Sequence, residues 1–355
     1  MKKFLPAILF LLVPAACENP LDYTPADTSS KLIVNALLEV GAETHAVYLG
    51  ISEPDCLDTI KNGTVACYVN GVKVADAVHA DAREWPKPHY AYLGSGSAYD
   101  SYMDPFIFEA DFREGDEVRI EATANNGAYK ASATVIVPSR PVMGKVTMEE
   151  KVRHIEGDYE YKVSVLSVPI EDVSPKPDYY SIALRFNYTI DGYDEGLYVT
   201  TEKDWYYLDM DTSEDIILSE DNVVSSRLEG DLFDIGSPNV FGAFLDGQFN
   251  GGAAVLHPSV YSDYLWIRSL EMESIADYIH VSRSMTVMLC HIPERQYYYY
   301  KALNGFLGSG SDLALEDISI PDNVDGGIGF VGIAYPVFQE IELQPYSYFT
   351  YIYEY

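Results

Sequence analysis

The sequence is poor in basic residues, cysteine, histidine and tryptophan. It holds 23 lysines and arginines against 55 aspartates and glutamates, with 4 cysteines, 7 histidines and 3 tryptophans in 355 residues. A chain with so few cations repels phosphate backbones and anionic headgroups, so nucleic acid is excluded as a partner and no basic membrane-binding patch is expected. We interpret the excess of acid as a source of solubility rather than as a cation site.

Recognisable catalytic and metal-binding motifs are also missing. The histidines show no H-E-x-x-H pattern or paired ligand spacing, no G-x-S-x-G turn occurs, and both LGSGS segments lack the lysine of a phosphate-binding loop. With 55 carboxylates, acid pairs close in sequence arise by chance, so no glycosidase-like pair stands out. We therefore expect no enzyme activity and no cofactor, and the mature chain contains no apolar run long enough to span a bilayer.

The first 30 residues predict a lipid anchor. Two lysines precede a short apolar run, and two alanines stand directly before Cys17. This order is typical of a secretory signal, residues 1–16, that is removed before an acylated cysteine. Residues 17–30 then form a polar tether between lipid and folded domain. The predicted mature chain keeps 21 basic and 55 acidic residues, a formal charge of −34. An ordinary secretory signal cleaved near Ala16 is the alternative.

Cys56 and Cys67 can form a disulfide on this sequence. They bracket a segment containing Asn62-Gly63, a strong turn signal, so they could meet across neighbouring strands. In an oxidising compartment such a bridge stabilises by about 2 to 3 kcal/mol. Two reduced, partly buried thiols are the alternative, because spacing alone does not show that the Cβ atoms face each other. Cys290 lies in an apolar strand-like run and is interpreted as a core residue.

Short runs rich in valine, isoleucine, tyrosine and threonine recur between turn-forming residues, which predicts an all-β protein. Residues 31–139, with hairpin turns at Asn70-Gly71 and Asn125–Gly127, indicate an N-terminal immunoglobulin-like or transthyretin-like β-sandwich. Two prolines mark a boundary, after which residues 140–355 predict a second β-rich domain with one or two short helices. The last two strand candidates before the C-terminal tail are residues 327–335 and 337–344.

One segment of the second half predicts a helix. Residues 293–308 begin with proline, end with glycines, and place Tyr299, Ala302, Leu303 and Phe306 on one face. We interpret this stripe as core packing, with a tyrosine-lined ligand platform as the alternative. For the lone tryptophans, packing is likewise favoured over ligand stacking. The aromatic residues proposed as a partner or ligand surface are Trp85, Trp205, Tyr297, Tyr300, Tyr351, Tyr353 and Tyr355.

An acidic segment has the spacing of calcium ligands. Side chains with oxygen stand at alternate positions, followed by a glutamate in twelfth place; they are Asp209, Asp211, Ser213, Asp215 and Glu220. Glu214 stands where the sharp turn of a calcium loop requires glycine, and the flanks predict strands rather than helices. We interpret the segment as a solvated acidic loop, with a calcium site as the alternative.

Several segments together resemble one family of Bacteroidota lipoproteins. They are the signal with Cys17, KLIVNALLE at 31–39, FREGDEVRIEATANNGAYKASATVIVP at 112–138, PDYY at 177–180, FLDGQFNGG at 244–252 and NVDGGIGFVG at 323–332. The family is domain of unknown function 4249, and the resemblance covers nearly the whole mature chain. Its members are often encoded beside TonB-dependent outer-membrane receptors, and no catalytic residues are established for it.

The resemblance implies a non-enzymatic lipoprotein of the outer membrane, on its periplasmic face or on the cell surface, that assists a TonB-dependent receptor in uptake or surface assembly. Its lipid is the expected means of membrane attachment. A surface glycan-binding protein is one alternative, in which Trp85 or Trp205 supplies a stacking face. A fimbrial subunit is another, although no arginine stands between the lipid and Arg83 for a processing protease.

Overall fold

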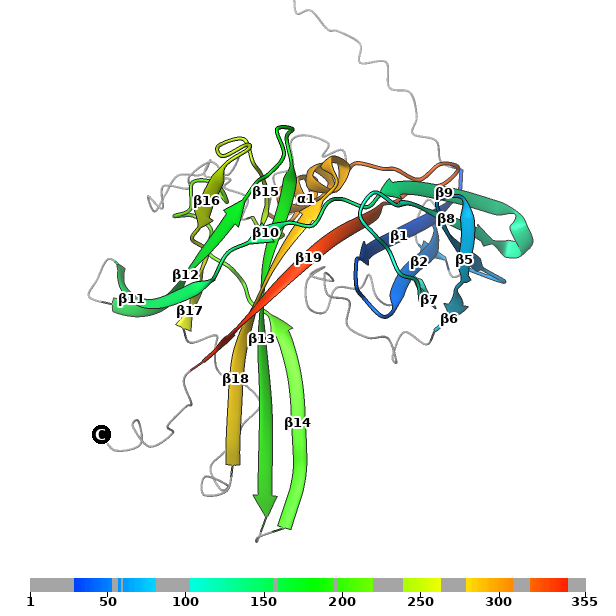
Figure 1. Cartoon of the computed structure of the whole chain (residues 1–355). Helices are drawn as coiled ribbons and strands as arrows, with labels where there is room; N and C mark the ends of the chain where they lie inside the picture. Colours follow the sequence, from blue (N-terminus) through cyan, green and yellow to red (C-terminus); the bar gives the residue numbers. More distant parts are fainter. Residues whose placement is uncertain are drawn as a thin grey trace, which may run out of the picture.

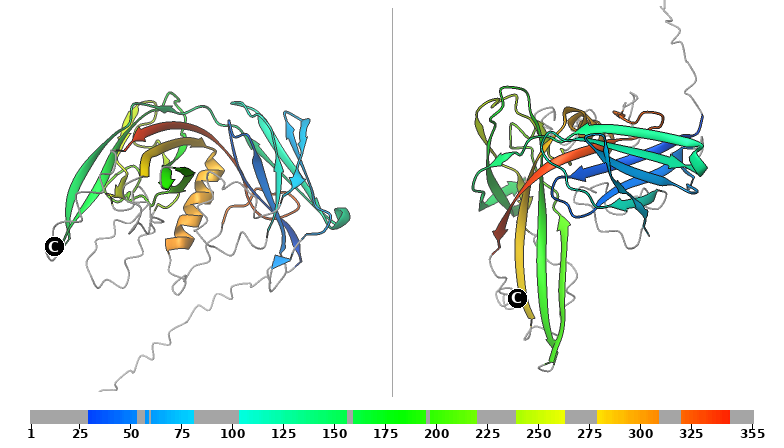
Figure 2. Two further views of the ribbon diagram at one scale, coloured as in Figure 1. Left: turned by 90° about the horizontal axis from the view of Figure 1, so that it is seen from below. Right: turned by 45° about the vertical axis from the view of Figure 1, so that its right-hand side comes forward.

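The computed structural model describes residues 29–52, 57–58, 60–80, 103–155, 159–194, 197–219, 239–262, 279–308 and 320–343. The described chain is mostly β-strand and carries one α-helix, α1 (Glu294–Gly308), which confirms the prediction of an all-β fold. Figure 1 shows two β bodies, and the view from below in Figure 2 places α1 between them. In the described part of the chain, no helix is both long and apolar enough to cross a membrane.

The N-terminal body is a β-sandwich. One of its sheets contains β1 (Lys31–Glu39), β2 (His45–Ser52), β3 (Leu57–Asp58), β6 (Val78–His79) and β7 (Asp104–Phe108). The facing sheet has the order β5 (Val72–Asp76), β4 (Thr64–Val69), β8 (Glu117–Ala124), β9 (Tyr129–Ile136). Buried and less buried residues alternate along β1 and β8, as the sequence predicts, so each strand directs one row of apolar side chains into a shared core.

Two hairpin turns of this body lie where the sequence predicts them. Asn70 and Gly71 join β4 to β5 with φ of 52° and 78°. Asn125, Asn126 and Gly127 join β8 to β9 with φ of 52°, 59° and 82°. These left-handed conformations favour asparagine and glycine, which explains why both hairpins are readable from the sequence.

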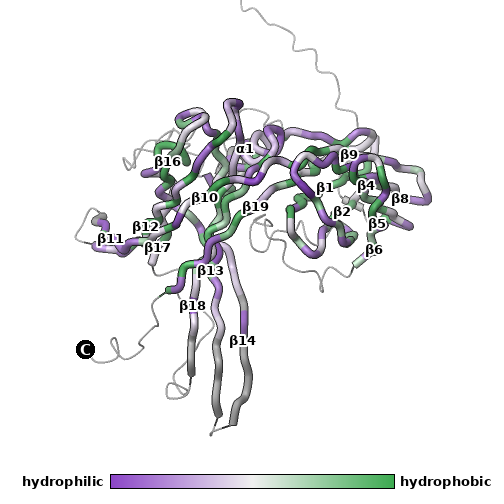
Figure 3. Tube along the Cα trace, viewed as in Figure 1, coloured by the Kyte–Doolittle hydropathy of each residue, from purple (hydrophilic) through white to green (hydrophobic). Residues whose placement is uncertain are grey.

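The C-terminal body pairs a small sheet with part of a long one. The small sheet contains β10 (Val142–Met143), β11 (Thr147–Ile155), β12 (Tyr159–Glu171), β16 (Ala253–Leu256) and β17 (Ser259–Tyr261). The long sheet contains β13 (Tyr179–Asp194), β14 (Leu197–Tyr207), β15 (Ala243–Leu245), β18 (Ile279–Ile292) and β19 (Val331–Glu342). A second core lies between the two sheets, and a smaller one forms beneath α1. In Figure 3 the hydrophobic stretches lie within the packed bodies, whereas several outer turns are hydrophilic.

The last strand joins the two bodies. β19 pairs with β18 on one side and runs parallel to β1 on the other, with Ala36 opposite Val331. Val324 and Ile333 belong to the N-terminal core. A Cβ atom on Gly329, whose φ is +121°, would lie 2.4 Å from the carbonyl oxygen of Val34, so this close approach requires glycine. Residues on the C-terminal side of the boundary predicted between residues 139 and 140 therefore contribute to the N-terminal core, and the long sheet runs through both bodies.

Three strands extend beyond the C-terminal body. β14, β13 and β18 lie side by side in that order and project together as an arm, seen at the bottom of Figure 1 and again in the right view of Figure 2. The ladder between β13 and β18 is continuous from Tyr179↔Ile292 to Gly192↔Ile279. β14 forms the outer edge of this arm, because no other described strand pairs with its far side.

Candidate functional site

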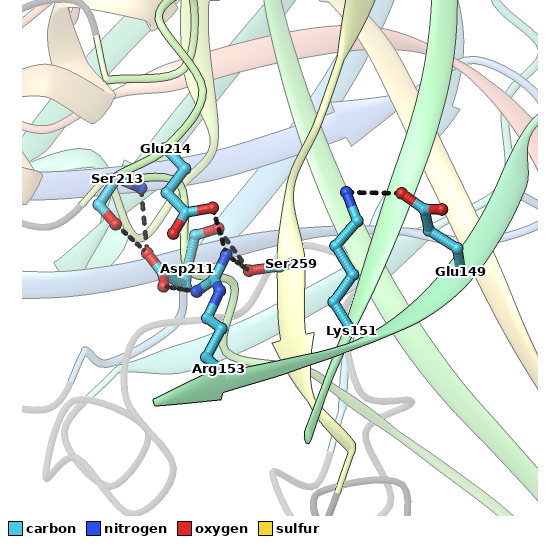
Figure 4. Close-up of polar contacts among 7 residues, drawn as sticks. All are labelled: Glu149, Lys151, Arg153, Asp211, Ser213, Glu214 and Ser259. Atoms are coloured by element: carbon cyan, nitrogen blue, oxygen red, sulfur yellow. Dashed lines mark hydrogen bonds and ion pairs between the residues drawn. The ribbon is translucent and has the colours of Figure 1, made fainter. Parts of the chain in front are cut away.

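The acidic segment proposed as a calcium loop is held by an arginine (Figure 4). Arg153 of β11 donates from Nη1 to Asp211 at 2.9 Å, and from Nη2 to Glu214 at 2.7 Å and to Ser259 at 3.3 Å. The second carboxylate oxygen of Asp211 accepts from the backbone N–H and the hydroxyl of Ser213, at 3.0 and 2.6 Å. Burial alone would raise the pKa of Asp211, but the hydrogen bonds from Ser213 and Arg153 hold it below its usual value.

Asp215 is the second carboxylate of the segment that the fold uses. It is only 4% exposed, and one oxygen accepts the backbone N–H groups of Ile217 and Leu218 at 2.8 and 2.9 Å. Its other oxygen accepts the N–H of His257. The sequence favours a solvated loop for this segment. The structure corrects this at Asp215, which caps a buried turn. Within the described ranges no group of three or more histidine, cysteine, aspartate or glutamate side chains has metal-holding geometry. Glu220 lies outside them.

The predicted aromatic surface is wrong at two of its positions. Tyr297 and Tyr300 are 2% and 1% exposed, and the ring of Tyr300 stacks on Phe241 at 4.9 Å. Their neighbour Tyr298 is 50% exposed. Among residues 294–304 of α1, the buried side chains are Gln296, Tyr297, Tyr300, Leu303 and Asn304, while the side chain of Phe306 from the predicted stripe is not described. These buried side chains differ from the predicted stripe because α1 packs against the long sheet through polar as well as apolar side chains.

Trp205 lies on the arm and is half-buried. The guanidinium of Arg185 lies 5.4 Å from the centre of its ring, and the ring of Tyr207 meets it edge-on at 5.5 Å. The arm thus uses part of this tryptophan for its own packing. The remaining predicted anchor and surface residues lie outside the described residues; they are Cys17, Trp85, Tyr351, Tyr353 and Tyr355.

Cys67 is a free thiol in the N-terminal core. It lies in β4, is 1% exposed, and burial raises its pKa to about 12, so it is a poor nucleophile. A free Cys67 contradicts the predicted bridge to Cys56, and the alternative of a reduced, buried thiol holds for Cys67; Cys56 itself lies outside the described residues. Cys290 lies buried in β18, as expected of a core residue.

A glutamate that the sequence pattern does not predict to be buried lies at the junction of the two bodies. Glu39 ends β1 and is 5% exposed. Burial raises its pKa to about 8, while the nearby positive charge of Arg185 acts in the opposite direction. The alternation along β1 places Glu39 on the more exposed face of the strand. That face is covered here, with Arg185 of β13, Tyr207 of β14 and Tyr300 of α1 close enough to exchange electrostatic effects with Glu39, and nothing in the local sequence predicts this.

Three aspartates and a histidine gather where β12, β13, β15 and β18 approach one another. Asp172, which follows β12, accepts the N–H of Ser174 at 2.9 Å and the N–H of Gly251 at 2.6 Å. Asp246, which follows β15, is fully buried, and neither of its carboxylate oxygens has a hydrogen-bond partner. Asp178 lies just before β13, with its backbone carbonyl accepting the N–H of Asp246 at 3.2 Å.

His291 of β18 connects this aspartate cluster to the chain between the two bodies. Its Nδ1 lies 3.0 Å from the carbonyl oxygen of Ser139 and 3.0 Å from that residue's hydroxyl, and its Nε2 lies 3.7 Å from Asp178. The segments PDYY and FLDGQFNGG supply Asp178 and Asp246. Those two motifs were the sequence features that could have pointed to this cluster, but only the fold brings their aspartates together.

Comparison with known proteins adds a family. The model of the family described as Domain of unknown function (DUF4249) matches residues 18–338. The chain belongs to this family. No curated protein matches it. Among solved structures, a DUF4785 family protein from Legionella pneumophila is 8% identical, with a TM-score of 0.22, over 73% of this chain and 52% of that one. The chain thus spans about half the length of that protein, and a score this low supports no argument about fold or function.

Proposed function

We propose that this DUF4249 protein is a non-enzymatic lipoprotein of the outer membrane that acts as the accessory partner of a TonB-dependent receptor. The predicted signal and Cys17 support attachment to the membrane through a lipid. The resemblance to Bacteroidota lipoproteins supports a TonB-dependent receptor as the partner. The structural observation that carries the proposal is the projecting arm of β13, β14 and β18, whose outer strand, β14, pairs on its far side with none of the described strands and can therefore accept another chain.

The register of β14 identifies which of its backbone groups face outward. The N–H of Leu208 donates to the carbonyl of Leu184 at 2.9 Å, and the same register continues along the arm, with Thr189 opposite Lys203. Because antiparallel pairs alternate between bonded and non-bonded, Glu202 directs its N–H toward β13 and Lys203 directs its N–H away. An extended segment of the receptor can therefore add to β14 by strand pairing.

Proline substitution at these two neighbouring positions tests the proposal. Lys203→Pro removes an outward N–H, which an edge strand tolerates, and should abolish receptor pull-down while leaving the thermal unfolding transition close to wild type. Lys203→Ala is the matched control and should retain the receptor. Glu202→Pro removes a bond to β13 and should lower stability. Retained pull-down by a folded Lys203→Pro protein would exclude the β14 edge, and absence of any receptor from wild-type pull-downs would refute the partnership.

The anchor is tested separately. Cys17→Ser should move the protein from the membrane fraction to the soluble fraction, because the lipid is its expected means of attachment. Unchanged partition, with no lipid on the mature N-terminus, would contradict the proposal. Glycan binding ranks second, since Arg185 and Tyr207 already contact the Trp205 ring that would stack on a sugar.

A further inference from the structure

The buried aspartate cluster, formed by Asp172, Asp178 and Asp246, has more carboxylate oxygens than hydrogen-bond donors. Asp246 is 0% exposed and its two oxygens lack a hydrogen-bond partner, whereas both oxygens of Asp172 already accept backbone N–H groups. The carboxyl of Asp172 raises the pKa of both Asp246 and Asp178, as expected of carboxyls that adjoin one another in a buried site. Two carboxylates in contact repel one another in a buried site unless a proton lies between them.

The ring of His291 carries one proton, and its contacts show on which nitrogen this proton lies. A carbonyl oxygen only accepts, so the contact with Ser139 requires the hydrogen to be on Nδ1. The unprotonated Nε2 of a neutral ring then faces Asp178 at 3.7 Å. Burial lowers the pKa of His291 below its ordinary 6.5, although Asp178 acts in the opposite direction, so the ring is neutral at pH 7 and does not neutralise the carboxylates there.

We propose that Asp246 and Asp172 share one proton, and that this proton locks the loop of residues 246–252 onto the end of β12. In the locked state, the protonated carboxyl of Asp246 donates to Asp172, whose other hydrogen bonds include the N–H of Gly251. Loss of the proton leaves adjacent carboxylates in a buried site. The repulsion between them loosens the loop.

Several titratable groups face the shared proton and set the pH at which it leaves. They are Asp178 and Tyr180 from the start of β13 and His291 from β18, with Glu114 acting on His291 from the N-terminal body. Burial first, and then the neighbouring carboxyls, raise the pKa of Asp246 to about 6. The folded state therefore holds the proton more tightly than the unfolded state. The stability that it contributes is complete in acid and is lost as the pH rises from about 4 to about 6.

The variant Asp246→Asn tests the lock, because its amide donates a permanent N–H to Asp172. Relative to this variant, the unfolding equilibrium constant of the wild type should rise about 100-fold between pH 4 and pH 7, the change expected for a pKa raised from 3.8 to about 6. Asp325→Asn, at an exposed aspartate, is the control and should follow the wild-type profile. Parallel profiles for wild type and Asp246→Asn would overturn the proposal.

Two measurements on the wild type keep the proposal falsifiable if the variant does not fold. Infrared spectra should show a protonated carboxyl band at pH 5 that is lost by pH 7, beside a second band from Glu39, whose pKa of about 8 keeps it protonated at both values. Hydrogen exchange of residues 244–252 should gain speed over the same range beyond the intrinsic pH effect. Absence of the first of these bands would overturn the proposal. Calcium chloride that raises the unfolding temperature at pH 7, reversed by chelator, would also overturn it, because a cation would then hold the carboxylates together.

Discussion

Replacing Glu39 with glutamine should remove a large pH dependence of stability. Glu39 is buried where β1 meets β19 and α1, and its pKa is about 8 in the folded protein against an ordinary value of 4.5. The folded state therefore binds this proton more tightly than the unfolded state. Its contribution to stability is fully present below about pH 4.5 and is lost as the pH rises to about 8.

The size of the effect follows from the shift in pKa. At 1.36 kcal/mol per pKa unit, moving from 4.5 to about 8 corresponds to about 5 kcal/mol of unfolding free energy. That is a large part of the roughly 5 to 15 kcal/mol that stabilises a typical domain. Glutamine has the same shape as the protonated acid and never ionises, so the Glu39→Gln protein should resemble the wild type in acid and exceed it in stability at alkaline pH.

Urea denaturation at pH 5, 6.5 and 8 measures this difference. The stability of the wild type should fall relative to Glu39→Gln across the series, by about 3.5 kcal/mol between pH 5 and pH 8, because part of the full effect lies below pH 5. Glu43→Gln, in the exposed turn after β1, is the matched control and should track the wild type. A constant difference between wild type and Glu39→Gln at all three values would show that Glu39 does not change its protonation state there, and would refute the reasoning.

Other predictions concern the acidic segment, the helix and the cysteines. Asp215→Ala should cost about 2 to 4 kcal/mol, because it leaves buried backbone N–H groups without an acceptor, whereas Glu214→Ala should cost under about 1 kcal/mol at its exposed ion pair. Equal losses in urea denaturation would contradict this. Tyr300→Ala should cost about 3 to 5 kcal/mol and Tyr298→Ala about 0.5 kcal/mol or less, as measured by thermal unfolding, since only the first ring is buried. Mass spectrometry after alkylation of the unfolded, unreduced protein should find both Cys67 and Cys290 labelled, because Cys67 is a free thiol in the structure; a Cys67 that is blocked together with Cys56 would contradict this.

The strands and hairpins were predictable because their signals are local. The alternation of residues 117–124 and 129–136 about Asn125–Gly127 specifies a hairpin without reference to the rest of the chain. β15 has only three residues and exists through its pairing with β13, so its sequence carries no strand signal of its own. Pro336 divided one strand into two candidates, yet β19 runs through it. β1 pairs with β19 only as far as Ala334, so beyond that point the proline faces an edge that needs no N–H.

The sequence by itself determined the all-β class, the turns, the acidic surface and the predicted lipid address, because composition and short-range periodicity encode each of them. Tertiary structure alone decided which polar side chains are buried together. Glu39 stands on the exposed face of its own strand until α1 covers it, and Asp172 meets Asp246 only when loops from distant strands converge. A side chain's pKa depends on these neighbours and on the water that they exclude, and no local pattern records either.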